Sequence, residues 1–472
     1  MRRDRSAVLH FASQVVRSIA GFGTTLFAAQ YFGASGLGIY SELLAVLFWV
    51  KLPGNSIRTA VSKRMSESEA VTGHFAAGAL TILGYGTAVG LVIYLFETRI
   101  NEYFGVEVAA LAFLLLATNM FLDITRGGIE GAKRVALSGW LNTLESIIRL
   151  LAQIGFALGG AMLLSLVYGH VLSMAAIAMV GLYLLRERLT IPSLSEFGDL
   201  RRFTQYSWLS NVEGVAINWL DLLVLGYFVT DDFIGIYTAV WTLTGFLALA
   251  GKSISSTLFP ELSQLGSDGR ISKARELISD SLLFTGIFLI PGLFGGAVIG
   301  DQLLRVYGAE FSRGALILLV LILARTMHTF GRQAINALNG LDYPQRTFRI
   351  NALFISANLV LNISLVFVFD QYGLGWYGAA IATLLSSCIY FAAGWVALSA
   401  EIGDIPFPVT GIGKQIVSSV VMTAVVYTLT LFVPDTLLSA VGLVFVGAAV
   451  YGSLLLAISS PIREKLLRVA DL

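Results

Sequence analysis

Long apolar runs recur along the whole chain and constrain its fold more than any other feature. Two of the clearest are 351–369 and 376–399, whose polar residues are almost all small or carry amides. A helix of about 20 residues crosses a bilayer core of ~30 Å. Only 13% of the 472 residues are charged, whereas soluble domains hold about 25%. The sequence therefore predicts an all-α polytopic membrane protein.

The apolar runs and the charges between them predict the number and direction of the spans. We expect about fourteen transmembrane helices, near 9–31, 37–57, 75–96, 107–126, 139–160, 163–185, 206–229, 235–258, 281–300, 313–335, 350–369, 376–399, 413–433 and 437–458. With the amino terminus in the cytoplasm, only Arg99, Arg305 and Arg313 of the 31 Lys and Arg residues lie outside. Basic residues favour the cytoplasmic side. The predicted location is the cell membrane, with both termini cytoplasmic.

Part of the chain is duplicated. The tripeptide Gly-Ile-Tyr at 38–40 recurs at 235–237, and Gly54 meets Gly251 at the same offset. A fainter match joins 131–134 to 340–346. Because each copy holds six spans, both begin on the same side of the membrane, and a parallel repeat is predicted. We therefore expect two pseudo-symmetric six-helix lobes that meet in a V, plus two C-terminal helices.

These lobes give the predicted domain organisation. The N-lobe covers 1–188, the C-lobe covers 206–400, and 401–472 holds two additional transmembrane helices and a cytoplasmic tail. The connecting segment 189–205 has apolar residues at roughly helical spacing beside two arginines. This pattern is typical of a helix in the cytoplasmic membrane interface. A simple tether is the alternative.

The stretch from 336 to 400 carries a resemblance to a known family. The matching residues are Asn339, Gly340, Pro344, Arg346, Asn358, Asn362, Gly373, Gly375, Gly378, Ala379, Ala380 and Thr383. The stretch resembles the lipid-linked oligosaccharide and polysaccharide flippases of the multidrug/oligosaccharidyl-lipid/polysaccharide exporter superfamily.

This resemblance implies a transporter and not an enzyme. Its substrate would be a polyprenyl-phosphate or pyrophosphate-linked oligosaccharide, moved from the inner to the outer leaflet for glycan biosynthesis. The implied mechanism is alternating access through a partly cationic central cavity. The implied partners are the lipid-linked substrate and the bilayer, and an association with glycan-synthesis enzymes stays open.

Charged and polar residues inside the predicted spans indicate where substrate passes, since such residues mostly face a bundle interior or a watery cavity. The first span has a stripe at spacings of three and four that consists of His10, Gln14, Arg17, Gly21 and Thr24. The seventh has Ser207, Asn211, Gly214, Asn218 and Asp221, with Glu213 to one side. Because these spans open the two lobes, we expect the stripes to face each other across the cavity.

Seven residues are the candidate substrate-binding set: Arg17, Gln14, Glu145, Arg149, Asn211, Asn218 and Lys51. Arginine presents forked donors that suit a phosphate. Glu145 and Arg149 lie four residues apart, so they form either a site whose acid is exchanged for a phosphate or a permanent ion pair. Lys51 either extends to the cavity or reaches the membrane interface.

Asp221 and Glu213 are the candidate residues for a coupling ion, H⁺ or Na⁺. The nearby Asn and Ser side chains could complete an oxygen coordination shell. The four histidines show no metal-ligand spacing, so no metal site and no cofactor are predicted. Gly251-Lys252-Ser253 resembles the end of a phosphate-binding loop, but the spacing and the apolar context do not fit one.

Two alternatives stay open. The first is a cation-coupled multidrug or small-molecule exporter of the same superfamily, whose members have twelve spans and an acid-dominated cation site. The extra helical pair and the arginines Arg17 and Arg149 count against it. The second is a membrane glycan polymerase, which usually needs a sizeable region outside the membrane, whereas the longest predicted outer loop has about a dozen residues. No feature indicates a nucleic-acid partner.

Overall fold

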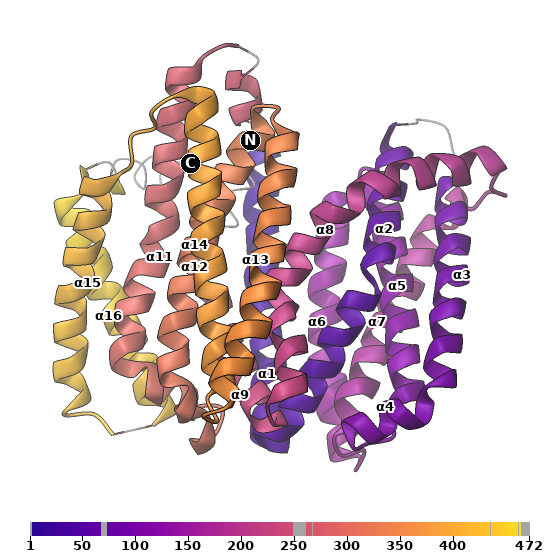
Figure 1. Cartoon of the computed structure of the whole chain (residues 1–472), viewed down its shortest axis with the longest axis horizontal. Coiled ribbons are helices and arrows are strands. Elements are labelled where there is room, and N and C mark those ends of the chain that lie inside the picture. The colour runs from indigo at the N-terminus through magenta and orange to yellow at the C-terminus, as the bar shows by residue number, and fades with distance from the viewer. Residues whose placement is uncertain are drawn as a thin grey trace. The chain divides into compact units, whose positions relative to one another are not determined.

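The computed structural model describes residues 2–67, 73–248, 261–266, 268–434, 436–460 and 462–463, and it describes side chains from residue 13 onward except at 206–211 and 437. Every regular element in these ranges is a helix (Figure 1). The chain divides into two compact units, unit 1 (Met1–Leu223) and unit 2 (Val224–Leu472). The predicted all-α class is confirmed.

Unit 1 contains α1 (Arg2–Val50), α2 (Leu52–Glu67), α3 (His74–Leu95), α4 (Glu97–Phe104), α5 (Ala109–Gly131), α6 (Val135–Leu158), α7 (Leu164–Leu185), η1 (Arg186–Arg188) and most of α8 (Leu194–Phe228). Helix α1 holds the first two predicted spans. They are joined at Gly33, whose φ of 73° lies in the left-handed region. Glycine adopts this conformation without steric cost because it has no Cβ.

Unit 2 contains the end of α8 and then α9 (Asp231–Leu247), α11 (Ile271–Arg305), η2 (Ala309–Gly314), α12 (Ala315–Gly340), α13 (Pro344–Asp370), α14 (Gly375–Ile402), α15 (Val409–Thr430) and α16 (Leu437–Ile458). Among the described residues, 11 helices are long and apolar enough to cross a membrane. The number of spans reaches the expected value of about fourteen when the two halves of α1 are counted separately and α8 and α9 are added.

The duplication is visible in two helix–helix turns. Lys133, between α5 and α6, has a φ of 63°, and Asp342, between α12 and α13, has a φ of 67°. The backbone amide of Arg134 donates to the carbonyl of Ile129 at 3.1 Å, and Tyr343 donates to Leu338 at 2.8 Å. The faint sequence match between 131–134 and 340–346 therefore marks the same turn in each half.

Two of the residues that carry the family resemblance, Asn358 and Gly378, join α13 to α14. The Asn358 amide donates to Ser386 Oγ at 2.9 Å, and the Asn362 amide donates to the Asn358 carbonyl at 3.0 Å. Both asparagines are completely buried. A Cβ added to Gly378 would lie 2.5 Å from the Leu365 carbonyl oxygen, so only glycine permits this close approach. Small residues and amide hydrogen bonds commonly join helices within membranes.

The two C-terminal helices pack on α11 of unit 2. Their shared apolar cluster includes Leu283 and Ile299 of α11, Met422 of α15 and Leu443 of α16. The Gln415 amide of α15 also donates to the Leu283 carbonyl at 2.7 Å. The predicted pair of additional helices is thus confirmed.

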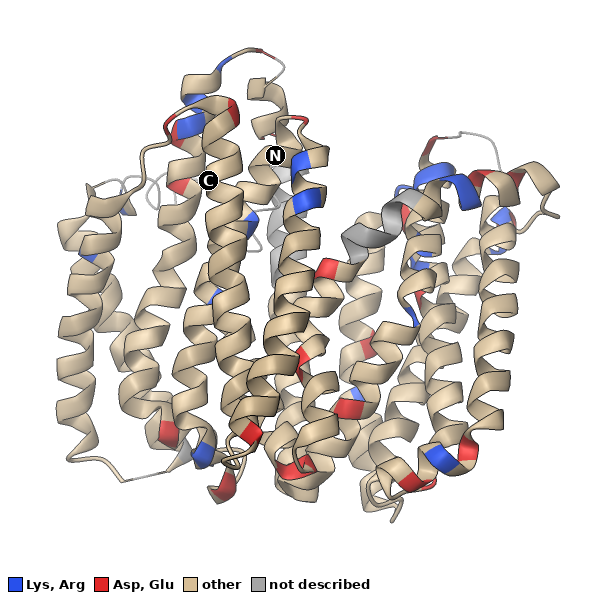
Figure 2. Cartoon of the chain, viewed as in Figure 1, with Lys and Arg blue, Asp and Glu red and all other residues tan. Residues whose placement is uncertain are grey.

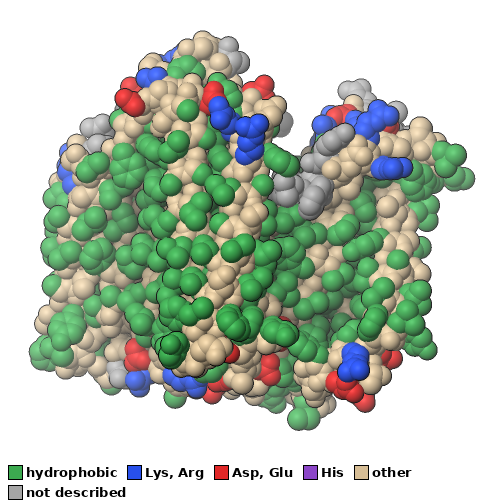
Figure 3. Space-filling model, viewed as in Figure 1, with side chains coloured by type: hydrophobic (Ala, Val, Ile, Leu, Met, Phe, Trp, Pro, Cys, Tyr) green, Lys and Arg blue, Asp and Glu red, His purple; other side chains and the backbone are tan. Residues whose placement is uncertain are grey.

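Charge is distributed unequally along each unit. Lys and Arg are concentrated at the upper end of each unit in Figure 2, whereas the lower end carries mostly Asp and Glu. Between the two ends, hydrophobic side chains cover the visible flank (Figure 3). The end of unit 1 where the end of α2, the α5–α6 turn and η1 come together is called its basic end below, and these segments contain Lys63, Arg134 and Arg188.

The predicted linker continues into the seventh span without a break, because α8 runs from Leu194 to Phe228. The compact units divide after Leu223, within this helix, so 206–223 pack with unit 1. The start of α8 is attached to the body of unit 1 by Glu196. Its carboxylate accepts hydrogen bonds from the backbone amides of Gly73 at 2.6 Å and Ser193 at 2.8 Å. The assignment of 206–400 to a second lobe stays a prediction.

Glu196 therefore generates a pH-dependent prediction. Its partial burial raises the carboxyl pKa, but the amides of Ser193 and Gly73 outweigh that effect, and the pKa lies below its usual value. A lowered native pKa gives stability that is present above the unfolded-state pKa of about 4.3 and is lost as the pH falls through the native value. Glu196→Gln should lower the free energy of unfolding by about 1–2 kcal/mol at pH 7.

Thermal unfolding of the purified protein across pH 3 to 7 measures this effect. The difference from the unmutated protein should shrink as the pH falls below about 4. Glu187→Gln, at a side chain that is 86% exposed, serves as the control and should leave the midpoint unchanged. If Glu196→Gln lowered the stability by the same amount at every pH, the lowered pKa of Glu196 would not be the source of the effect.

Candidate functional site

Unit 1 contains eight charged side chains that interact across α1, α2, α5 and α6. This unit-1 charge cluster consists of Arg17, Lys51, Arg58, Asp123, Arg126, Glu130, Glu145 and Arg149. It has five cations and three carboxylates, which gives a formal net charge of +2.

Lys51 lies at the break between α1 and α2 and is held by α5. Its Nζ donates to Asn119 Oδ1 at 2.6 Å and to Asp123 Oδ2 at 2.9 Å. The ammonium also lies 4.4 Å from the centre of the Phe48 ring. Lys51 is 7% exposed. It is therefore held inside unit 1 by its bonds to α5.

The pairing continues along α2 and α5 toward the basic end. Asp123 also accepts from Arg126 at 3.4 Å. Arg58 Nη2 contacts both carboxylate oxygens of Glu130 at 2.7 and 2.8 Å. A Cβ added to Gly127 would lie 2.8 Å from the Arg58 carbonyl oxygen, so the two backbones approach closely here. Each of these cations has a carboxylate partner on the facing helix or one turn away.

Glu145 and Arg149 of α6 form an ion pair at 3.7 Å that α7 supports. Ser173 donates to Glu145 Oε1 at 2.9 Å, and Arg149 Nη1 lies 3.0 Å from His170 Nε2. Since a guanidinium only donates, His170 Nε2 accepts, and the hydrogen is assigned to Nδ1, which lies 2.8 Å from the Tyr40 hydroxyl. Both members of the pair are thus held by neighbours, which favours the permanent ion pair over the exchangeable site.

Arg17 differs from the other cations of the cluster. Its side chain is exposed, and it makes no hydrogen bond or ion pair with any residue that the structure describes. It interacts electrostatically with Arg149, Glu145, Asp123 and Arg58 without contacting them. Within the described part of unit 1, the other four cations of the cluster each contact a carboxylate, whereas Arg17 does not.

The other predicted residues lie on α1 and α8. Gln14 is half-buried one turn before Arg17, whereas Glu213 and Asp221 are buried. Asn218 is exposed, and its amide donates to the Gly214 carbonyl of its own helix at 2.7 Å. The Asn211 side chain lies outside the described residues.

An aromatic contact places α8 beside α1. Trp219 of α8 stacks on Phe48, with ring centres 4.4 Å apart. Because Phe48 also contacts Lys51, this part of α8 lies next to the charge cluster.

Our sequence-based candidate set omitted five polar residues of α2 and α5 that the structure adds: Arg58, Asn119, Asp123, Arg126 and Glu130. Four of them share one face of α5, because 119, 123, 126 and 130 are spaced by four, three and four residues. This spacing was the available signal. Their partners on α1 and α2 depend on tertiary packing, which the spacing does not reveal.

Comparisons with known proteins agree with this architecture. The polysaccharide biosynthesis protein family matches residues 78–314. The probable flippase AglR of Haloferax volcanii is 31% identical over 98% of this chain and 97% of its own length. The probable low-salt glycan biosynthesis flippase Agl15 of the same organism is 28% identical with the same coverage.

Solved structures share the fold at low sequence identity. A lipid II flippase MurJ in an inward closed conformation has a TM-score of 0.78 at 16% identity, covering 98% of this chain and 100% of that one. An inward-facing multidrug resistance MATE family transporter has a TM-score of 0.68 at 14% identity, covering 84% of this chain and 98% of its own. The chain therefore belongs to the polysaccharide biosynthesis protein family, within the flippases of the multidrug/oligosaccharidyl-lipid/polysaccharide exporter superfamily.

Proposed function

We propose that this flippase moves a polyprenyl-phosphate or pyrophosphate-linked oligosaccharide from the inner to the outer leaflet of the cell membrane. The observation that carries this proposal is the exposed Arg17, which has no partner among the described residues of a cluster with a net charge of +2. Arginine binds phosphate through forked, always-charged donors, and such charge-assisted bonds are about twice as strong as neutral ones.

The neighbouring charges make Arg17 the better phosphate ligand. Lys51 and Arg58 are already bonded to carboxylates, so a phosphate would have to displace those partners. Arg17 has no such bond to lose within the described part of the chain. A phosphate at Arg17 would also be attracted by the net positive charge of the cluster without contacting its other members.

Two relatives support the substrate class. AglR and Agl15 are named as probable flippases, and Agl15 is assigned to glycan biosynthesis. A hydrophilic glycan needs a polar passage, which the charges of unit 1 could supply, while the lipid tail stays in the bilayer. The basic end of unit 1 would face the cytoplasm, since basic residues favour that side.

The exporter alternative has less support. The match to the MATE transporter covers 98% of that transporter but only 84% of this chain. The match to MurJ covers 98% of this chain. The chain also has α15 and α16 beyond the predicted twelve spans of the two lobes. Both observations favour the flippase branch of the superfamily.

Arg17→Gln should reduce flipping of a polyprenyl-pyrophosphate oligosaccharide at least tenfold in reconstituted vesicles, because phosphate capture loses its unpaired cation. Protein level and thermal midpoint should stay unchanged, since no described protein contact is removed. Arg17→Lys should retain part of the activity. Normal flipping by a well-folded Arg17→Gln protein would show that Arg17 does not bind the substrate phosphate.

Lys51→Met is the matched comparison and should affect stability instead. Removing Lys51 leaves Asp123 buried without its bonded ammonium, and breaking a buried pair costs about 3–5 kcal/mol. The thermal midpoint should therefore fall, and the double variant Lys51→Met, Asp123→Asn should recover part of it, because it removes the unpaired negative charge while the amide oxygen still accepts from Arg126. If the double variant were less stable than Lys51→Met, loss of the Lys51–Asp123 pair would not be the cause of the lower thermal midpoint.

Ion coupling is the third part of the proposal. Asp221 and Glu213 are buried carboxylates on α8, in the part of α8 that packs with unit 1, and either could bind H⁺ or Na⁺. Asp221→Asn or Glu213→Gln should abolish the stimulation of flipping by an imposed ion gradient. Substrate binding should change less than twofold. Flipping by the unmutated protein that ignores both gradients would exclude this coupling.

A further inference from the structure

A second cationic site lies at the basic end of unit 1, apart from the charge cluster. A pocket of about 240 Å³ is enclosed by the α5–α6 turn, the first turns of α6, the end of α7 and η1. Ile129, Leu137, Leu184 and Leu185 form its apolar lining, and Arg134, Arg188 and Glu187 are its charged residues. None of these residues belongs to the proposed transport site.

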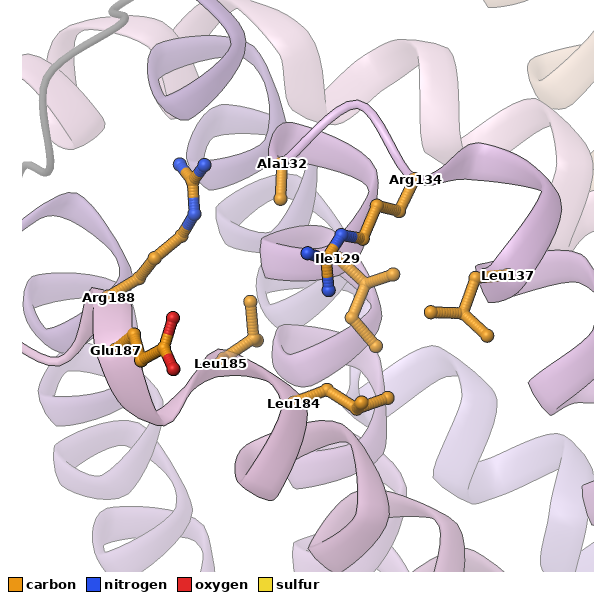
Figure 4. A pocket seen from close by; sticks show the side chains of 8 residues that line it. All are labelled: Ile129, Ala132, Arg134, Leu137, Leu184, Leu185, Glu187 and Arg188. Carbon is orange, nitrogen blue, oxygen red and sulfur yellow. The ribbon is translucent and has the colours of Figure 1, made fainter.

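Arg134 and Arg188 have no acidic partner among the residues that the structure describes. Figure 4 shows Arg134 and Arg188 on opposite sides of the pocket, with the side chain of Ile129 close to Arg134. Neither guanidinium lies within 4.0 Å of a carboxylate in the described part of the chain. Glu187 also lines the pocket, but its ion-pair contact is Arg186, at 4.0 Å. The pocket therefore has two cations without a carboxylate partner among the described residues, and one acid, Glu187, whose charge would repel a bound anion.

The local fold gives this pocket its shape. Lys133 adopts a φ of 63°, which reverses the chain sharply after α5 and brings Arg134 back over Ile129. At the opposite wall, α7 tightens into η1 after Leu185 and places Arg188 one turn later. Arg134 and Arg188 are thus fixed by two separate helix ends.

An apolar surface leads away from the pocket along α6. Trp140, Leu144, Ile147 and Leu151 are each more than a third exposed. Together with Leu137 they are spaced by three and four residues, which places them on one face of the helix. From Leu137 to Leu151 this stripe is about 21 Å long at 1.5 Å per residue. One leaflet of the hydrocarbon core is about 15 Å thick, so the stripe is long enough for one lipid chain.

We propose that this pocket binds the phosphate of an anionic membrane lipid, with the lipid chain lying along the exposed stripe of α6. The pocket is smaller than the ~300–1,000 Å³ typical of sites for drug-sized ligands, so it suits a phosphate and not an oligosaccharide. The two guanidinium groups would supply charge-assisted hydrogen bonds to the phosphate. The apolar lining and stripe require a ligand with a chain, which inorganic phosphate lacks.

Native mass spectrometry of the full-length protein, titrated in detergent, tests the site with three probes: phosphatidylglycerol, polyprenyl phosphate and inorganic phosphate. We expect at least one lipid to bind, and Arg134→Gln with Arg188→Gln to weaken its binding tenfold or more. Glu187→Gln should tighten binding several-fold, because it removes the opposing charge. This gain cannot arise from misfolding.

Matched controls separate this site from general surface charge and from transport. Arg201→Gln with Arg202→Gln removes the same charge from exposed positions at the same end of the unit and should leave binding unchanged. Arg17→Gln should also leave it unchanged, whatever its effect on flipping. The lipid that binds more tightly identifies the source of the phosphate. Unchanged lipid binding by the double Arg134/Arg188 variant, or equally tight binding of inorganic phosphate, would overturn the proposal.

Discussion

A charge inside a bilayer has to be neutralised or has to face water, and the arrangement of unit 1 follows from that constraint. Placing one charged side chain at mid-membrane costs about 2.5–3.5 kcal/mol on insertion scales. The pairs Lys51–Asp123 and Arg58–Glu130 reduce this cost, and they also join α5 to the α1–α2 region. The pair Glu145–Arg149 within α6 reduces the cost as well, and α7 supports this pair. The same bonds therefore lower the cost of the charges and connect the helices. Arg17, which has no such bond among the described residues, has its charge available for a ligand.

The residues that carry the family resemblance have a different task from the charged ones. Asn358 and Asn362 are completely buried between α13 and α14, and Gly378 allows the two backbones to meet. These contacts set the spacing of a helix pair within unit 2 and leave no polar group of Asn358 directed at solvent. The motif thus reports the architecture of the superfamily, while the charged residues of unit 1 are the better guide to chemistry.

The sequence predicted the fold well because span length and hydrophobicity are local properties. It also located the repeated turn, since Lys133 and Asp342 follow glycine-terminated helices in both halves. Partner choice was harder to predict. Lys51 pairs with Asp123, 72 residues later, and Arg134 shares a pocket with Arg188 on another helix. Such pairs depend on which helices are neighbours and how they are rotated, and neither periodicity nor spacing contains that information.

Charge balance relates the fixed pairs to the proposed transport. A ligand shifts a conformational equilibrium only if it binds the two states differently. Cations already bonded to carboxylates offer a phosphate little, because each new bond would replace an existing one. The eight-residue cluster has a formal charge of +2, without the buried acids Glu213 and Asp221 on the adjacent part of α8, and it would attract the two negative charges of a pyrophosphate diester. A state in which Arg17 faces the bound pyrophosphate would therefore be favoured over one in which it does not, and a lipid monophosphate diester, with one negative charge, would favour that state less. Arg17, which has no bonded partner among the described residues, would thus both attract the proposed substrate and favour a diphosphate over a single phosphate.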